Sequence, residues 1–365
     1  MIDDEVIETS DDTENEGKGG LYPYDPTQAD IDIRESPHSI YELMRKYDDG
    51  RLIIDPEFQR NLVWKLEQKS KFIESIILNF PLPPFYVNET REGKYIIVDG
   101  LQRTTALYEF IHNKFRLSGL EALQHLNGKN FDDLKKMSGA YQTKIEDKKI
   151  TLYVLRPSVP LSVIYDLFNR INTGGTKLER QEVRNCIYLG KATQLLKELS
   201  KEDYFKIAID NGISPKRMKD REAILRYLSF QLFDYQNDYK GDLSAFVEQS
   251  MREINKMSDE KISVLKTNFE RVMKISYEFF ADKNFRVPLS GKTTRGRINI
   301  AVLESVGYFF SINTNEFLNK NKTLIIGNYK RLLENTDYLD AVQKSTGDRK
   351  RVISRFELAR KILGD

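Results

Sequence analysis

The residues best suited to chemistry lie in one segment, Asp99-Gly100-Leu101-Gln102-Arg103, where a strand pattern gives way to a helix pattern. Residues 95–98 are apolar or aromatic β-formers, and the apolar residues from Ala106 onward recur at helical spacing. Gly100 can take the positive φ that such a reversal often needs. The first amides of the new helix have no carbonyl partner within it, and the positive end of its dipole lies there too. We therefore expect an anion, most often a phosphate, at this turn.

The side chains of this segment suit phosphoryl chemistry. Arg103 lies seven residues before Phe110 and would continue the inward face of the helix, where a guanidinium can fork onto a phosphate. An aspartate beside phosphates is repulsive unless it holds Mg²⁺ or positions water, so Asp99 is the predicted metal ligand or base. Gln102 would orient the attacking water. A structural alternative stays open, in which Asp99 caps the helix and Arg103 pairs with Asp99.

Two other loops supply further candidate contacts to a nucleotide. Arg60 would neutralise charge on the phosphoryl oxygens, although it can equally pair with an acid of its own loop. Asn172-Thr173-Gly174-Gly175 is a second glycine-rich turn into a helix, so its amides are predicted to bind the nucleotide and Asn172 to contact the base or ribose. Asn172 can instead only stabilise its turn. The predicted nucleotide-binding set is completed at the first turn by Gly100, Leu101 and Thr104.

Composition excludes several other classes of protein. The chain has 365 residues, of which 40% are hydrophobic and 31% charged, as in a soluble globular protein with room for two domains. It contains one cysteine and three histidines without metal-ligand spacing, so a zinc site and a histidine-dependent nuclease centre are not expected. No run of about eighteen apolar residues and no secretory signal are visible, so we expect a cytoplasmic protein with no membrane contact.

Charge and hydrophobic period divide the chain into three parts. Residues 1–20 carry a net charge of −7, against +2 for the whole chain, so residues 1–30 are predicted to form a disordered acidic tail. Residues 31–155 are predicted to form a small mixed sheet with helices, and residues 156–365 to form helices only. The predicted fold class is therefore α+β followed by an all-helical domain.

The first predicted domain alternates short apolar runs with helical patterns. Strands are expected at 52–54, 85–87, 95–98 and 150–155, and helices from Ser36 to before Gly50, over about 66–79 with Phe80 on its apolar face, and after Gly100. Residues 112–149 are polar and mixed, with no predicted element. Helical patterns in the second domain cover roughly 191–204, 217–235, 242–257, 260–281, 298–311, 323–336 and 349–362. Cys186 is predicted to be a small buried residue within a helix.

Four segments in order carry a family resemblance: Phe58-Gln59-Arg60 with Val63-Trp64, Phe72–Ile76 with Pro81-Leu82-Pro83, Val98–Thr104, and Phe168–Leu178. They resemble the ParB/sulfiredoxin-like domain of the GmrS half of GmrSD-type modification-dependent restriction enzymes. The resemblance implies a nucleotide-binding and often NTP-hydrolysing module of phage defence, whose Asp-Gly-Gln-Gln-Arg box falls on residues 99–103. Leu101 departs from that box, where the family usually has glutamine. The departure implies weak or lost hydrolysis if the missing glutamine orients water.

The resemblance also implies partners. Restriction members attach an HNH nuclease domain after their helices, but residues 200–365 contain no histidine or cysteine for one, so a separate nuclease chain is the expected partner. A homo-oligomer is a further expectation. Basic clusters in the helical domain could track a DNA backbone, and they comprise Lys216, Arg217, Lys219, Arg221, Arg295, Arg297, Arg349, Lys350, Arg351 and Arg355. The segments Gly296–Glu304 and Arg351–Phe356 resemble the family's helical extension more loosely.

Three functions follow from these features. The leading one is an NTP-binding protein, as a Mg²⁺-dependent NTPase, that gates DNA recognition or a partner nuclease in a phage-defence or restriction system. A second is a ParB-like DNA-binding module in which nucleotide acts as a switch. A third is a catalytically inactive interaction or immunity factor, which the departure at Leu101 favours.

Overall fold

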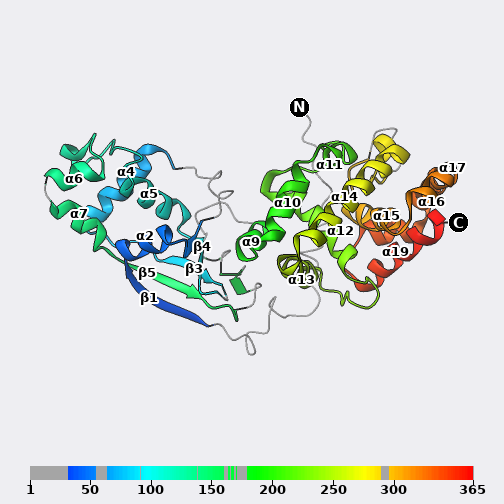
Figure 1. The fold of residues 1–365 in the computed structure, drawn as a ribbon, viewed down its shortest axis with the longest axis horizontal. Helices are drawn as coiled ribbons and strands as arrows, with labels where there is room; N and C mark the ends of the chain where they lie inside the picture. Colours follow the sequence, from blue (N-terminus) through cyan, green and yellow to red (C-terminus); the bar gives the residue numbers. More distant parts are fainter. Residues whose placement is uncertain are drawn as a thin grey trace. The chain divides into compact units, whose positions relative to one another are not determined.

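The computed structural model describes residues 32–54, 64–90, 92–137, 139–159, 163–164, 166–167, 170, 179–288 and 296–364. The described residues divide into two compact units (Figure 1), one that precedes Leu178 and one that begins at Glu179. We call them the sheet unit and the helical unit. The domain borders predicted at residues 30 and 155 stay predictions, because much of the chain around them lies outside the described residues.

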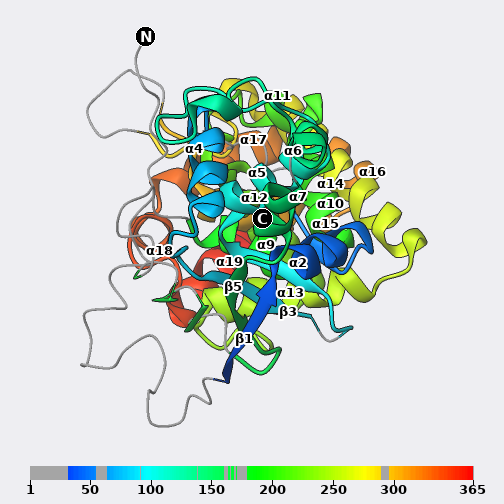
Figure 2. The ribbon, with the colours of Figure 1, turned by 90° about the vertical axis from the view of Figure 1, so that its left-hand side faces the viewer.

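The sheet unit is built on a mixed sheet of five strands in the order β1-β5-β3-β4-β2. Its β1 and β5 are antiparallel and run side by side in Figure 2, β5 and β3 are parallel, β3 and β4 antiparallel, and β4 and β2 parallel. The strands are β1 (Ile33–Ser39), β2 (Leu52–Ile53), β3 (Phe85–Glu89), β4 (Tyr95–Asp99) and β5 (Lys149–Leu155). The small mixed sheet predicted from the sequence is therefore confirmed.

One face of this sheet carries the core of the sheet unit. Alternate residues along a strand point to the same face, and Phe85, Val87, Leu152 and Val154 all join one buried cluster with side chains of the helices. The helical elements are α2 (Ile40–Asp48), α4 (Leu66–Ile77), α5 (Leu101–Ile111), η2 (Gln124–Leu126), α6 (Phe131–Met137) and α7 (Gly139–Glu146). This packing fixes the end of β4 and the start of α5, which together carry the Asp99–Arg103 segment.

The start of the first predicted helix is wrong, because residues 36–39 belong to β1. Pro37 pairs with Thr151 of β5, and a proline is tolerated there because β1 is an edge strand. The helix begins only after Ser39, whose hydroxyl accepts from the Glu42 amide at 3.1 Å while its own amide donates to the Glu42 carboxylate at 2.8 Å. This reciprocal capping box, rather than Pro37, sets the boundary.

Two further expectations for the sheet unit fail. Helix α4 ends at Ile77, and Phe80 is 55% exposed instead of lying on the apolar face of that helix. Residues 112–149, for which no element is predicted, contain α6 and α7. The short helix α6 is preceded by Asn130, whose side chain accepts from the Asp133 amide at 2.9 Å, and it buries only Phe131 and Leu134.

The helical unit contains no strand longer than an isolated bridge among its described residues, as predicted. Its elements are α9 (Arg180–Ile187), α10 (Lys191–Lys201), α11 (Asp203–Ala208), η3 (Lys216–Met218), α12 (Lys219–Leu232), α13 (Leu243–Lys256), α14 (Asp259–Phe280), η4 (Ala281–Lys283), α15 (Ile300–Ile312), α16 (Asn315–Lys320), α17 (Lys322–Glu334), α18 (Thr336–Gln343) and α19 (Arg349–Gly364). Each predicted helical pattern overlaps at least one of them, and the pattern at 191–204 spans both α10 and the start of α11. No separate helix is predicted for α16 or α18. Cys186 is buried within α9, as predicted. Among the described helices, none combines the length and apolar character that a membrane span requires.

Candidate functional site

The turn from β4 to α5 is the centre of the predicted site. Gly100 is the N-cap of α5 with φ 99° and ψ 13°, in the left-handed region, and it has no side chain with which to cap the helix. Among the described residues, the Asp99 carboxylate accepts from Arg103 and from no amide of α5. The alternative in which Asp99 caps α5 is therefore wrong. Amides of the first helical turn have no acceptor within the helix, so the uncapped N-terminus keeps donors and a positive dipole end for an anion.

Only glycine fits at position 100, for two separate reasons. Its φ is one that L-residues rarely adopt, and a Cβ added there would lie 2.5 Å from Cδ1 of Phe85. Gly93 makes a matched comparison, because it has a φ of 74° but no atom within 4 Å of an added Cβ. The site is thus packed tightly against β3 at the point where the chain turns.

We predict that Gly100→Ala lowers the free energy of unfolding of the sheet unit by about 1–3 kcal/mol through backbone strain, and by more through the clash with Phe85. Trp64, the one tryptophan in the sequence, reports on this unit because it packs on Phe72 with a ring separation of 5.5 Å. Its fluorescence in a urea titration measures the loss. Gly93→Ala should cost less, and equal losses in the two variants would show that the contact with Phe85 does not matter.

The guanidinium of Arg103 is held by acceptors of its own unit. Its Nη2 lies 2.7 Å from Oδ2 of Asp99 and donates to the Pro84 carbonyl at 3.1 Å, while Nη1 donates to the Pro83 carbonyl. Its Cζ lies 4.4 Å from the ring centroid of Phe85, a cation–π contact. The pairing of Arg103 with Asp99 that the sequence left open is therefore confirmed.

Burial decides the electrostatics of this pair. The Arg103 side chain is 11% exposed, and its burial lowers the pKa of the guanidinium, against the opposing effect of the Asp99 carboxylate. An arginine remains charged even so, because its ordinary pKa lies far above neutrality. The guanidinium has more N–H donors than these bonds use. The pair thus fixes a positive group at the start of α5 with donors left for a ligand.

Gln102 and Thr104 are both engaged by the backbone. The Gln102 side-chain oxygen accepts from the Trp64 amide at 3.4 Å, which ties the start of α5 to the chain that precedes α4. Thr104 is fully buried, and its hydroxyl and amide both donate to the Gly100 carbonyl, at 3.0 Å and 2.8 Å. Leu101 is half-buried against the core of the sheet unit. The roles predicted for these residues toward a nucleotide stay predictions.

Several predicted site residues cannot be placed. Arg60, Asn172, Thr173, Gly174 and Gly175 lie outside the described residues.

The structure adds Thr105, which the sequence reading missed. Its hydroxyl is buried and has no hydrogen-bond partner among the described residues. Position 105 lies one helical turn after Leu101, so the helix period places the two on one face. This helical spacing from Leu101 is the feature of the sequence from which Thr105 could have been added to the predicted site residues.

A metal would find few ligands at this site. Among the described residues, no group of three His, Cys, Asp or Glu side chains could hold a metal ion. Asp99 offers one carboxylate, already paired with Arg103. A single carboxylate fits Mg²⁺ only where phosphates supply further oxygens, which is the usual arrangement of nucleotide sites.

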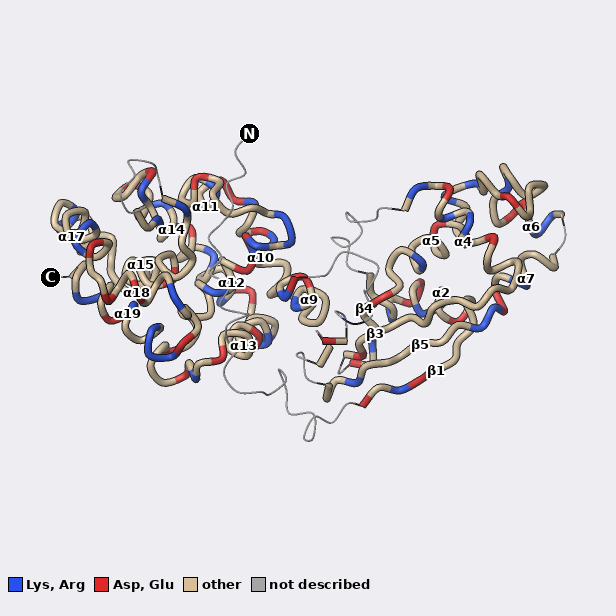
Figure 3. The backbone as a smooth tube through the Cα atoms, turned by 180° about the vertical axis from the view of Figure 1, so that it is seen from behind, with Lys and Arg blue, Asp and Glu red and all other residues tan. Residues whose placement is uncertain are grey.

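Two of the predicted DNA-contacting arginines are buried, which contradicts that role for them. Arg355 has no exposed surface and donates to Glu304 at 2.6 Å and to the Thr346 carbonyl at 2.5 Å, and Arg221 is buried as well. Arg295 lies outside the described residues. In Figure 3, Lys and Arg segments of α10 to α19 lie among Asp and Glu segments. The cluster residues that are exposed are Lys216, Arg297, Arg349 and Lys350.

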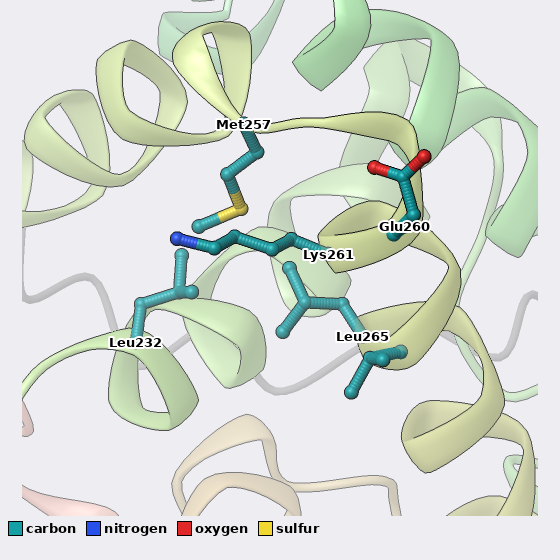
Figure 4. Close-up of a pocket in the computed structure, with 6 residues that line it drawn as sticks. Leu232, Met257, Glu260, Lys261 and Leu265 are labelled. Carbon is teal, nitrogen blue, oxygen red and sulfur yellow. The ribbon is translucent and has the colours of Figure 1, made fainter.

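A pocket of about 270 Å³ lies in the helical unit between the ends of α12 and α13 and the start of α14 (Figure 4). It is lined by Leu232, Met257, Glu260, Lys261, Val264 and Leu265. Figure 4 shows the Glu260 carboxylate pointing away from the apolar side chains. Such a lining lacks the convergent donors that a triphosphate needs, so this pocket does not compete with the turn at Gly100.

Comparison with protein families gives a match that covers the candidate site. Residues 40–189 match the family model described as GmrSD restriction endonuclease, N-terminal domain, so this part of the chain is similar to a GmrSD-type N-terminal domain. The match runs from α2 through α9 and includes the whole Asp99–Arg103 segment. No curated protein and no solved structure matches the chain. A domain of this type indicates a component of a phage-defence restriction system.

Proposed function

We propose that the sheet unit binds a nucleoside triphosphate at the N-terminus of α5 and, with Mg²⁺, hydrolyses it to control DNA recognition or a partner nuclease. The observation that carries the proposal is the uncapped start of α5 behind Gly100, with the Asp99–Arg103 pair beside it. An uncapped helix start supplies donors and positive potential, and the pair adds a fixed guanidinium. The match of residues 40–189 to a GmrSD-type N-terminal domain supports a role in a restriction system.

Each residue of the turn has a separate proposed role in nucleotide binding. The amides of the first turn of α5 would receive the phosphate oxygens, and Arg103 would offset charge that builds up on them. Asp99 holds Arg103 in position and places a carboxylate beside the start of α5, so it is the proposed protein ligand of Mg²⁺. A bound Mg²⁺ supplies charge neutralisation of the phosphates. Gln102 is the residue proposed to orient water.

The test of turnover is phosphate release from ATP, GTP and CTP, each with and without DNA and with Mg²⁺ present or chelated. We expect Mg²⁺-dependent release for at least one nucleotide. Asp99→Asn should reduce turnover more than nucleotide affinity, because the carboxylate is assigned to the metal. Equal loss of affinity and turnover would instead make Asp99 a purely structural partner of Arg103.

A second candidate function is nucleotide binding without hydrolysis, as an occupancy switch for DNA binding. Leu101 favours it, because the resemblance places glutamine there, and Gln102 is already bonded to the Trp64 backbone. Tight nucleotide binding with no phosphate release in any of the conditions above would select this function. A separate nuclease chain and a second copy of this chain remain the proposed protein partners.

If DNA is a ligand, its affinity should fall at least about tenfold between 50 and 200 mM salt, since even two phosphate contacts give that slope. Fluorescence anisotropy of labelled duplex measures the slope. Lys216→Ala with Lys350→Ala should flatten it, because both side chains are exposed in the helical unit. A salt-independent affinity, or no binding at low salt, would show that these basic residues do not bind the DNA backbone.

A further inference from the structure

A row of side chains crosses the sheet unit at the level of Asp99. Strand pairing places Glu35 opposite Tyr153, Tyr153 beside Tyr86, and Tyr86 opposite Asp99. Cross-strand partners point to the same face of a sheet, and Tyr86 and Tyr153 alternate with the core residues Phe85, Val87, Leu152 and Val154. The two tyrosines therefore lie on the face opposite the core.

A β-bulge brings Asp99 into this row. Val87 pairs with Ile97, but its neighbour Tyr86 pairs with Asp99, so Val98 is one extra residue on β4. Without the extra residue, Tyr86 would pair with Val98, and Asp99 would fall beyond the row. Bulges re-aim side chains in this way and occur often beside functional sites. Burial, with smaller contributions from Tyr153 and Asp99, raises the pKa of Tyr86, against the opposing effect of Arg103.

The two tyrosines form an aromatic surface on this face of the sheet. Their ring centroids lie 5.1 Å apart at an interplanar angle of 31°, and both side chains are half-buried. Neither hydroxyl makes a hydrogen bond with another described residue. Farther along the same face, Asn88 and Leu155 are buried, so the exposed part of this face is the part nearest the turn at Gly100.

We propose that Tyr86 and Tyr153 are the surface on which the base of the bound nucleotide stacks. This inference rests on the proposed function, because it takes the phosphates to lie at the start of α5. Tyr153 lies two strand spacings from Asp99, about 10 Å, so phosphate and base would occupy opposite ends of one row. Aromatic stacking accepts any base, so the site would select for a nucleotide over inorganic phosphate more strongly than for one base over another.

The experiment is a binding titration of ATP, GTP, CTP and inorganic tripolyphosphate against the full chain. Tyr86→Leu and Tyr153→Leu should each weaken nucleotide binding about five- to hundredfold, the range for loss of one stacking contact, and leave tripolyphosphate affinity unchanged. Tyr86→Phe should keep nucleotide affinity, since it keeps the ring. Tyr41→Leu is the matched control, because Tyr41 belongs to the same unit and is 55% exposed on α2.

Each other outcome overturns a distinct part of the account. Nucleotide affinity equal to tripolyphosphate affinity, or unchanged in both leucine variants, overturns the stacking surface and leaves the phosphate site standing. Absence of binding for every nucleotide and for tripolyphosphate overturns the proposed function together with this inference. Should a leucine variant fail to fold by circular dichroism, Tyr86→Phe and Tyr153→Phe with tripolyphosphate as reference still separate ring from hydroxyl.

Discussion

Arg103→Ala should weaken nucleotide binding by roughly ten- to hundredfold, because a charge-assisted hydrogen bond to phosphate contributes about 1.5–3 kcal/mol. The same change leaves the Asp99 carboxylate and the carbonyls of Pro83 and Pro84 without their donor, so the sheet unit should also lose about 1–3 kcal/mol of stability. Isothermal titration with nucleotide measures the first effect. Trp64 fluorescence during urea unfolding measures the second.

The two effects of this substitution separate two roles for Arg103. Arg103→Lys keeps the positive charge but loses the planar fork of the guanidinium. It should therefore restore only part of the nucleotide affinity that Arg103→Ala loses. A variant that is destabilised yet binds nucleotide as tightly as the wild type would show that Arg103 only holds α5 against the carbonyls of Pro83 and Pro84. The matched control is Arg116→Ala, which removes a 61%-exposed arginine of the same unit that pairs with Asp133.

Glu304→Gln should destabilise the helical unit by about 3–5 kcal/mol, the largest stability effect we predict. Glu304 on α15 is fully buried, with one carboxylate oxygen 2.6 Å from Nε of Arg226 on α12 and the other 2.6 Å from Nη2 of Arg355 on α19. Arg355 is fully buried too. Removing this negative charge leaves the two guanidinium groups that it joins facing each other, one of them on a fully buried side chain in surroundings of low dielectric. Circular dichroism in a urea titration measures the loss, because it reports chiefly on helices.

An exposed ion pair provides the comparison for Glu304. Glu270 and Lys274 pair on α14 with side chains 40% and 56% exposed, so Glu270→Gln should cost no more than about 1 kcal/mol. Replacing Glu304 and Arg355 together by methionine should cost less than Glu304→Gln, since no unpaired buried charge is then left at position 355. Equal and small losses for Glu270→Gln and Glu304→Gln would contradict the role given to this buried cluster.

The sequence predicts those parts of the fold whose cause is local. Ile150, Leu152 and Val154 alternate along β5, and the alternation that predicts the strand is also what buries these residues in the core. Gly100 predicts the turn after β4, because few other residues adopt its φ. The Glu304–Arg355 pair joins α15 and α19, although the sequence alone does not reveal that these helices meet.

What the sequence misses depends on contacts between distant segments. β1 contains Pro37 and no clear alternation, and it is a strand because it pairs with β5 along its length. The place of Arg103 between Asp99 and the carbonyls of Pro83 and Pro84 follows from packing α5 beside the chain before β3. The extra residue Val98, which sets Asp99 opposite Tyr86, likewise appears only when β3 and β4 are paired.

The most direct measurement is a crystal structure of the chain with a slowly hydrolysed ATP analogue and Mg²⁺. Our account predicts phosphate oxygens within hydrogen-bond distance of the amides at residues 101–103, with Arg103 still paired to Asp99 and the base against Tyr86. A nucleotide bound elsewhere, or a turn at Gly100 closed over by protein side chains while nucleotide is present at saturating concentration, would contradict the central claim.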